Sequence, residues 1–192
     1  INFARPRGNT RQNRFSFNRS ASISNNPVKH WVLGIILKNI LLLGATGSIG
    51  KSVLSVISQN DHKFNLYGIS FNKNIVEGDE IIKNFSPSFA HINNKEAFEK
   101  QSHKKSCNFI NGDDSFEDLI KNDDIDIIVC ATSGFAGLKA ASIAASTGKK
   151  ILLANKESIV AGGDLILPIA KKNSTQIIPI DSEHNAIFQC LS

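Results

Sequence analysis

The chain has 192 residues, enough for one sizeable core or for a domain with a tail, and its content of 41% hydrophobic and 20% charged residues is ordinary for a globular protein. No apolar run approaches the roughly 18 residues that a membrane-spanning helix requires, so we expect no membrane among its partners. The net charge of +5 is also unevenly placed, because residues 1–38 hold seven Lys or Arg and no acid, whereas the remainder has a net charge of −2, which predicts no nucleic-acid surface.

The first 27 residues are rich in Arg, Asn and Ser and lack apolar periodicity, so they cannot bury enough surface to fold. We predict a disordered basic tail over residues 1–37. Its composition is typical of an organelle transit peptide, which indicates a plastid-type organelle (apicoplast or chloroplast) and otherwise the cytoplasm. A disordered extension without function and a nucleic-acid-binding arm are the alternatives. Because the chain begins with Ile and runs to Ser192 without a stop signal, we expect it to be part of a longer protein.

From residue 38 onward, short apolar runs alternate with amphipathic stretches. The runs predict strands at 40–43, 66–71, 89–92, 108–110, 125–131, 150–154 and 176–180. The stretches between them predict helices at 48–58, 74–84, 95–102, 115–122, 135–147 and 157–171. This alternation specifies an α/β fold with a doubly wound parallel sheet, a Rossmann-like domain over 38–180. Residues 181–192 would then begin a second, incomplete catalytic domain.

Three glycines follow the first strand. Gly44, Gly47 and Gly50 have a GxxGxxG spacing and lead directly into the first helix. Such a loop permits a tight turn, a close approach of the backbone to phosphate, and close packing of helix on strand. The helix amino terminus then offers N–H groups to a pyrophosphate. The sequence therefore predicts a dinucleotide site here rather than a plain turn.

The end of the second strand discriminates between the two nicotinamide cofactors. NAD sites usually place an acid there to bind the ribose 2′-hydroxyl. This chain has Asn72, Lys73 and Asn74 instead, with no acid to repel a 2′-phosphate and one Lys to hold it. We therefore predict NADP(H), although Lys73 alone could be an ordinary loop lysine.

Two polar clusters follow the last two strands. Asn155, Lys156 and Glu157 open one helix, and Asp181 and Glu183 open the next. Ligands bind at the carboxyl ends of parallel strands, so both clusters should lie on the functional edge. The D-x-E pair can direct two carboxylates at one Mg²⁺ or Mn²⁺, with a third carboxylate supplied from beyond Ser192. Simple helix capping is the alternative for both clusters.

The cysteines and histidines, which could bind metals or take part in catalysis, form no recognisable motif. The three cysteines, Cys107, Cys130 and Cys190, have no metal-ligand spacing, and we expect reduced, buried thiols. None of the histidines is assigned a role, and His184 beside the D-x-E pair is expected to be structural.

The segments GATGSIG, NKN, LLANKESIV and PIDSEHNAIFQCL together resemble the 1-deoxy-D-xylulose 5-phosphate reductoisomerase family over about residues 38–192. The resemblance implies NADPH binding by the glycine loop and the NKN segment, although family members often have Gly at the position of Asn72. It also implies Lys156, Ser182 and Glu183 on the substrate, Asp181 and Glu183 on the metal, and Lys156, Asp181 and Glu183 as catalytic residues. The implied cofactor-binding residues are Gly44, Thr46, Gly47, Ser48, Ile49, Gly50, Asn72, Lys73, Asn74, Asn155 and Glu157.

The resemblance further implies a reaction. The metal would chelate a phosphorylated ketose substrate, the skeleton would rearrange, and NADPH would reduce the product to 2-C-methyl-D-erythritol 4-phosphate. The family continues with a further metal carboxylate, a covering loop, phosphate-binding residues and a helical domain, and we expect a homodimer when the protein is full length. This chain lacks those parts, so we expect it to be inactive alone. A metal-independent NADP-dependent dehydrogenase of a small carbonyl compound, or a non-catalytic NADPH-binding regulatory module, are the alternatives.

Overall fold

The computed structural model describes residues 37–190, apart from the side chains of Glu183 and His184, so the predicted tail lies almost wholly outside the described residues. The strands are β1 (Lys38–Leu43), β2 (Phe64–Phe71), β3 (Phe89–Ile92), β4 (Asn108–Ile110), β5 (Ile127–Cys130), β6 (Lys150–Leu153) and β7 (Gln176–Pro179). The helices are α2 (Ser48–Gln59), α3 (Ile75–Phe85), α4 (Lys95–Gln101), α5 (Asp113–Lys121), α6 (Gly134–Ala145), α7 (Lys156–Lys172) and α8 (Ser182–Cys190).

All seven strands form one sheet in the order β4-β3-β2-β1-β5-β6-β7, and every neighbouring pair is parallel. The order reverses at β1, which pairs with β2 on one edge and with β5 on the other. This is the switch point at which ligands bind in open parallel sheets. The predicted doubly wound parallel sheet is confirmed.

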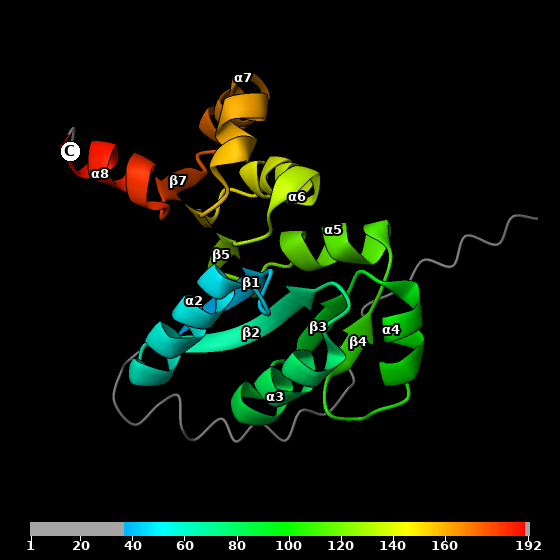
Figure 1. Cartoon of the computed structure of the whole chain (residues 1–192). Helices are drawn as coiled ribbons and strands as arrows, with labels where there is room; N and C mark the ends of the chain where they lie inside the picture. The colour runs from blue at the N-terminus through cyan, green and yellow to red at the C-terminus, as the bar shows by residue number, and fades with distance from the viewer. Residues whose placement is uncertain (1–36, 191–192) are drawn as a thin grey trace, which may run out of the picture. The chain divides into compact units, whose positions relative to one another are not determined.

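Helices cover both faces of the sheet (Figure 1). Alternate residues of β1 enter two separate cores: Ile40 and Leu42 pack with α2, α3 and α4, and Leu41 and Leu43 pack with α5, α6 and α7. Burial on both faces explains why β1 is apolar at consecutive positions rather than alternating. The inward face of α6 is built from small residues, which let the helix approach the sheet closely: Ala140, Ala141, Ala144 and Ala145.

Every element predicted between residues 40 and 180 is present, with ends shifted by at most two residues. The expectation of buried thiols holds fully only for Cys130, since Cys107 is half-buried and Cys190 is exposed. Burial raises the pKa of the Cys130 thiol to about 12, and burial together with nearby Asp79 does the same for Cys107. No helix within residues 37–190 is both long and apolar enough to span a membrane.

Candidate functional site

The glycine loop is held by the strands around it. The N–H groups of Gly44 and Ala45 both donate to the carbonyl of Ser70 at the end of β2, each over 2.9 Å. Gly44 has a φ of +84°, and a Cβ there would lie 2.7 Å from the carbonyl oxygen of Ala131 after β5. A Cβ on Gly50 would lie 2.5 Å from two loop carbonyl oxygens. Both positions therefore require glycine.

The amino terminus of α2 is open to a ligand. Its N-cap is Gly47, which has no side chain to cap the helix, and the first turn contains no acid. Gly47, Ser48 and Ile49 are exposed, and Thr46 is half-buried. The N–H groups of the first helical turn have no intrahelical acceptors, so they and the helix dipole favour an anion at this point. The geometry matches the predicted pyrophosphate site.

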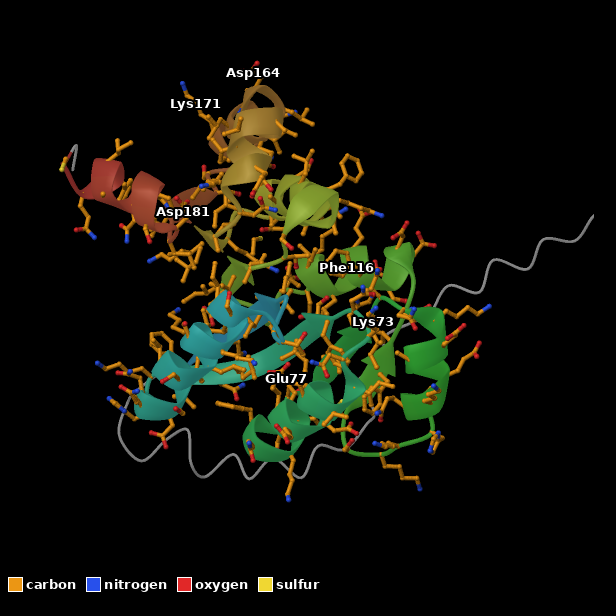
Figure 2. All side chains as sticks on the ribbon, viewed as in Figure 1. Lys73, Glu77, Phe116, Asp164, Lys171 and Asp181 are labelled. Carbon is orange, nitrogen blue, oxygen red and sulfur yellow. The ribbon has the colours of Figure 1, made fainter. Side chains whose placement is uncertain are left out.

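The segment after β2 differs in one respect from the sequence expectation. Asn72 and Lys73 are exposed, as a 2′-phosphate site requires. Asn74, however, is the N-cap of α3: its Oδ1 accepts from the N–H of Glu77 over 3.4 Å, and its Nδ2 donates to the Glu77 carboxylate over 2.7 Å. An acid, Glu77 in the first turn of α3, therefore does lie close to this segment (Figure 2).

Backbone hydrogen bonds join the strand ends along one edge of the sheet. Ala131 N–H donates to Leu43 carbonyl over 2.9 Å, and Ala154 N–H donates to Cys130 carbonyl over 3.0 Å. Ile180 N–H donates in the same way to Leu153 carbonyl over 2.9 Å. The glycine loop, the 155–157 segment and the 181–183 segment therefore begin at neighbouring positions on one edge. Sequence reasoning predicted this arrangement.

Asn155 connects two loops of that edge. Its buried side chain donates from Nδ2 to the carbonyls of Thr132 (2.8 Å) and Gly134 (3.2 Å), and its Oδ1 accepts from the N–H of Ser158 over 3.2 Å. A Cβ on Gly137 would lie 2.0 Å from Asn155 Nδ2, so α6 must approach through a glycine. The amide of Asn155 is thus engaged in fixing the 132–134 loop, whose Thr-Ser-Gly sequence after a strand could have indicated its place in the site.

The start of α7 presents two of the predicted charged residues. Lys156 and Glu157 are exposed in its first turn. Ser158 is fully buried, and among the described residues its hydroxyl has no hydrogen-bond partner. Lys156 therefore lies where a ligand at the strand ends can reach it.

Asp181 begins α8. Its carbonyl accepts the N–H of Asn185 over 3.0 Å, so it occupies the N-cap position, half-buried, at the junction of β7 and α8 (Figure 2). Ser182 is exposed beside it. The Glu183 side chain lies outside the described residues, so the metal pair stays a prediction. The described residues contain no group of three His, Cys, Asp or Glu that could hold a metal, and a D-x-E pair fits a divalent cation in the type of its donor atoms but needs further ligands.

His91 was not assigned a role from the sequence, yet it supports the site. It is buried at the end of β3, with Nε2 3.3 Å from the Gly112 carbonyl and Nδ1 3.5 Å from the Ser70 hydroxyl. Its ring packs on Phe116 with centroids 4.6 Å apart. Burial lowers the pKa of His91, against smaller opposing effects of the Gly112 carbonyl and Asp113. The neutral ring therefore donates from Nε2 to the Gly112 carbonyl, and its Nδ1 accepts from the hydroxyl of Ser70. The carbonyl of the same Ser70 accepts the two N–H groups of the glycine loop.

Comparison with known proteins identifies the family. The family model of 1-deoxy-D-xylulose 5-phosphate reductoisomerase matches residues 40–163, more than half of the chain. The chain belongs to this family. The reductoisomerase of Clostridium novyi is 42% identical over 162 residues, which cover 81% of this chain and 42% of that protein.

Solved reductoisomerases share the fold. One in complex with NADPH, fosmidomycin and magnesium is 36% identical with a TM-score of 0.76, over 80% of this chain and 39% of that one. The enzyme from Zymomonas mobilis in complex with NADPH is 33% identical with a TM-score of 0.75, over 81% of this chain and 41% of that one. The chain thus spans about two fifths of the length of the reductoisomerases that it matches, and the family resemblance predicted from its motifs is confirmed.

Proposed function

We propose that this chain is the NADPH-binding part of an enzyme that converts 1-deoxy-D-xylulose 5-phosphate to 2-C-methyl-D-erythritol 4-phosphate in non-mevalonate isoprenoid biosynthesis. The observation that carries the proposal is the hydrogen-bonded edge along which the glycine loop, the 155–157 segment and the 181–183 segment follow β1, β6 and β7. Relatives named for this substrate share this part of the molecule. Turnover would require the parts of those relatives that this chain does not span.

The cofactor site fits NADPH. The open first turn of α2 would hold the pyrophosphate, because its N–H groups and dipole are directed at the loop. Lys73, exposed after β2, would hold the 2′-phosphate together with Asn72. Asn155 would act indirectly by fixing the 132–134 loop, whereas Glu157 is exposed in the first turn of α7. When bound, NADPH supplies the hydride, and a relative has been solved with this cofactor.

The substrate site would lie at the ends of β6 and β7. Lys156 would orient the substrate hydroxyls through its ammonium group, and Ser182 would donate a hydrogen bond to the substrate. Asp181 and Glu183 would hold Mg²⁺ or Mn²⁺, which acts as a Lewis acid on the ketone when bound. A relative solved with magnesium supports the choice of a hard cation.

The proposal is tested on the protein extended beyond Ser192 to the length of its relatives. Consumption of NADPH with 1-deoxy-D-xylulose 5-phosphate should require the divalent ion and stop in chelator. Asp181→Ala should abolish turnover while leaving the NADPH dissociation constant nearly unchanged, because the cofactor binds on the glycine loop. Lys156→Ala should raise KM for the substrate in the same protein.

Asp164→Ala is the matched control, since Asp164 is an exposed carboxylate in the middle of α7, away from the strand ends (Figure 2). It should leave turnover unchanged. Full activity in chelator, or an active Asp181→Ala variant, would assign the carboxylates to helix capping and favour a metal-independent dehydrogenase. NADPH binding without any turnover of the extended protein would favour a regulatory module.

We also propose a location and an assembly for the full-length protein. The basic, acid-free composition of residues 1–37 supports import into a plastid-type organelle. The family resemblance supports a homodimer. Size-exclusion chromatography with light scattering on the extended protein measures the assembly, and a monomer at micromolar concentration would contradict it.

A further inference from the structure

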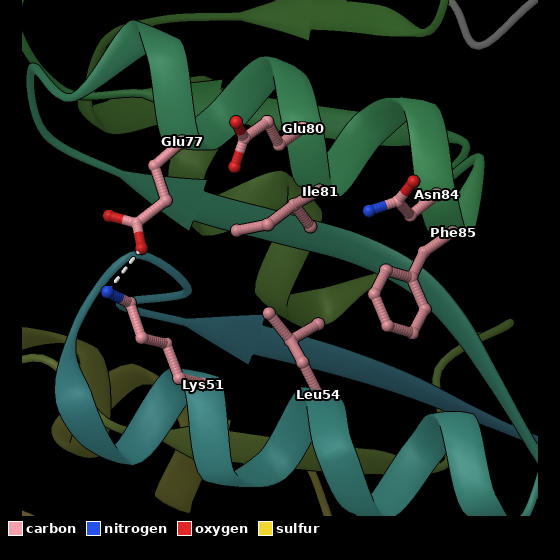
Figure 3. Close-up of a pocket in the computed structure, with 7 residues that line it drawn as sticks. All are labelled: Lys51, Leu54, Glu77, Glu80, Ile81, Asn84 and Phe85. Atoms are coloured by element: carbon pink, nitrogen blue, oxygen red, sulfur yellow. Dashed lines mark ion pairs between the residues drawn. The ribbon is translucent and has the colours of Figure 1, made fainter.

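An ion pair joins the two helices that flank the proposed cofactor site. Lys51 follows the last loop glycine in α2, and its Nζ lies 2.6 Å from the Glu77 carboxylate in the first turn of α3 (Figure 3). The second oxygen of that carboxylate accepts a hydrogen bond from Asn74 over 2.7 Å. Lys51 remains largely exposed, whereas the Glu77 side chain is only 21% exposed. Both carboxylate oxygens of Glu77 are therefore engaged by groups of this chain.

The position of Glu77 gives the pair its significance. It lies four residues after Lys73 and in the first turn after the strand end that selects the cofactor. A carboxylate near that strand end accepts the ribose 2′-hydroxyl of NAD and repels the 2′-phosphate of NADP. The pair lies at one end of a pocket of about 380 Å³ between α2 and α3, whose other lining residues are Leu54, Glu80, Ile81, Asn84 and Phe85 (Figure 3). Lys51 is the one cation among these lining residues, and Glu80 is a second carboxylate, so Lys51 alone among them can balance the charge of Glu77.

We propose that the Lys51–Glu77 ion pair determines the cofactor preference of the site. Lys51 neutralises Glu77, and together with Asn74 it holds the carboxylate toward α2, so that the segment at 72–74 accepts a 2′-phosphate. Without Lys51, the Glu77 carboxylate regains its full charge beside the ribose, repels NADPH and offers NADH an acceptor for its 2′-hydroxyl. This inference rests on the proposed NADPH site and names a residue pair that sets its selectivity.

The test compares dissociation constants for NADPH and NADH, followed by nicotinamide fluorescence, in the chain and four variants. Lys51→Met should lower the NADPH-over-NADH preference at least tenfold, equivalent to about 1.4 kcal/mol. Glu77→Gln should keep or increase the preference. The Lys51→Met/Glu77→Gln double variant should behave as Glu77→Gln does, because the repelling charge is gone. Lys83→Met, which removes an exposed cation from the last turn of α3, should change nothing.

The double variant separates this inference from direct phosphate binding by Lys51. If the double variant keeps the low preference of Lys51→Met, then Lys51 contacts the phosphate itself and the proposal is overturned. An unchanged preference in Lys51→Met overturns it as well, while NADPH binding and the proposed function stand. Failure of the unaltered chain to bind NADPH would defeat both. Because Lys51 is largely exposed, the ion pair adds little to stability and the variants should fold. Lys51→Gln serves as a second substitution if circular dichroism shows otherwise.

Discussion

Gly47 and Gly50 belong to one motif, but a methyl group would meet different surroundings at each. At Gly50 it would lie 2.5 Å from the carbonyl oxygens of Gly44 and Ala45, whereas at Gly47 the nearest atom is 3.3 Å away. We predict that Gly50→Ala forces α2 off the loop and lowers the free energy of unfolding by about 1–3 kcal/mol. Gly47→Ala should change it by less than about 1 kcal/mol but weaken NADPH binding about tenfold, because the ligand needs the bare backbone.

Urea denaturation and NADPH titration of the two glycine variants separate the roles. Equal losses of stability in the two variants would contradict a packing role for Gly50 and a ligand-binding role for Gly47. Undiminished NADPH affinity in Gly47→Ala would contradict them as well. Gly50→Ala is expected to lose affinity only in proportion to the distortion of the loop.

The buried imidazole of His91 links stability to pH. Burial lowers the pKa of His91 in the folded protein below its ordinary value of 6.5, so the unfolded chain takes up the proton first as the pH falls. The contribution of neutral His91 to the free energy of unfolding is therefore fully present above pH 6.5. It is lost as the pH falls from there toward the pKa of His91 in the folded protein, and the free energy of unfolding changes by at most about 1.4 kcal/mol per pH unit.

His91→Gln keeps an N–H for the Gly112 carbonyl and does not titrate. The difference in free energy of unfolding between this variant and the original chain should be constant above pH 7 and should shift in favour of the variant between pH 6.5 and 5. Denaturation midpoints of the two proteins measured at intervals between pH 7 and pH 5 test this. A constant difference across that range would show that His91 is not the group that links stability to pH.

Single residues mark the boundary of what the sequence could predict about the site. Asp181 directly follows an apolar run and Lys156 follows another after Asn155, so the local pattern was enough to place both on one edge. The Lys51–Glu77 pair joins residues on two different helices, and no local pattern specifies which side chains meet across such a gap. Asn74 had two compatible roles, helix cap and ligand contact, and the geometry shows that it caps α3.

At the scale of elements, two adjacent glycines of α7 face different neighbours. A Cβ on Gly162 would lie 2.3 Å from Cδ1 of Leu138 in α6, whereas a Cβ on Gly163 would lie 3.7 Å from its nearest atom. We predict that Gly163→Ala stabilises the protein by about 0.5–1 kcal/mol, since alanine favours helix. Gly162→Ala should destabilise it by about 1–3 kcal/mol, because α6 and α7 must separate or Leu138 must move.

Chemical denaturation of both alanine variants and of the Gly162→Ala/Leu138→Ala double variant measures this contact. The double variant should show less than the sum of the two single losses, because the shortened side chain makes room for the methyl group. Strict additivity would place the cost of Gly162→Ala elsewhere in α7.

The elements themselves were largely predictable, whereas their arrangement was not fully so. β1 and β5 are short apolar runs in the sequence because both faces of each strand are buried. Their short length distinguished them from helices. The start of α5 was misplaced by two residues because Asp113 and Asp114 form its first turn, before the first apolar residue. The alternation of strands and helices gave a parallel sheet, but the position of β1 between β2 and β5 depends on which apolar faces meet, which no single segment encodes.

At the scale of the molecule, the strands and helices from β1 onward supply both cores of the described domain. Within residues 37–190, the buried and partly buried residues of the two cores fall between 40 and 180. We therefore predict that deleting residues 1–36 leaves the thermal midpoint within about 2 °C and NADPH affinity unchanged, since each 1 kcal/mol would shift the midpoint by about 2–4 °C in a domain of this size. Scanning calorimetry of the shortened chain measures this. A drop well beyond that margin would show that the segment packs on the domain.

The central position of β1 also sets an order of events during synthesis on the ribosome. Of the buried residues in the core formed with α2, α3 and α4, only Val129 lies beyond residue 109, so most of that side of the sheet can close early. The opposite side of β1, with Leu41 and Leu43, must wait for β5 and for helices made only after residue 113. For the time in which roughly 20 further residues emerge, about 1–4 s at ordinary elongation rates, the nascent chain therefore carries an unpaired strand edge and a bare apolar face. A chaperone that binds exposed apolar surface at the ribosome would find a binding site on this partly folded intermediate.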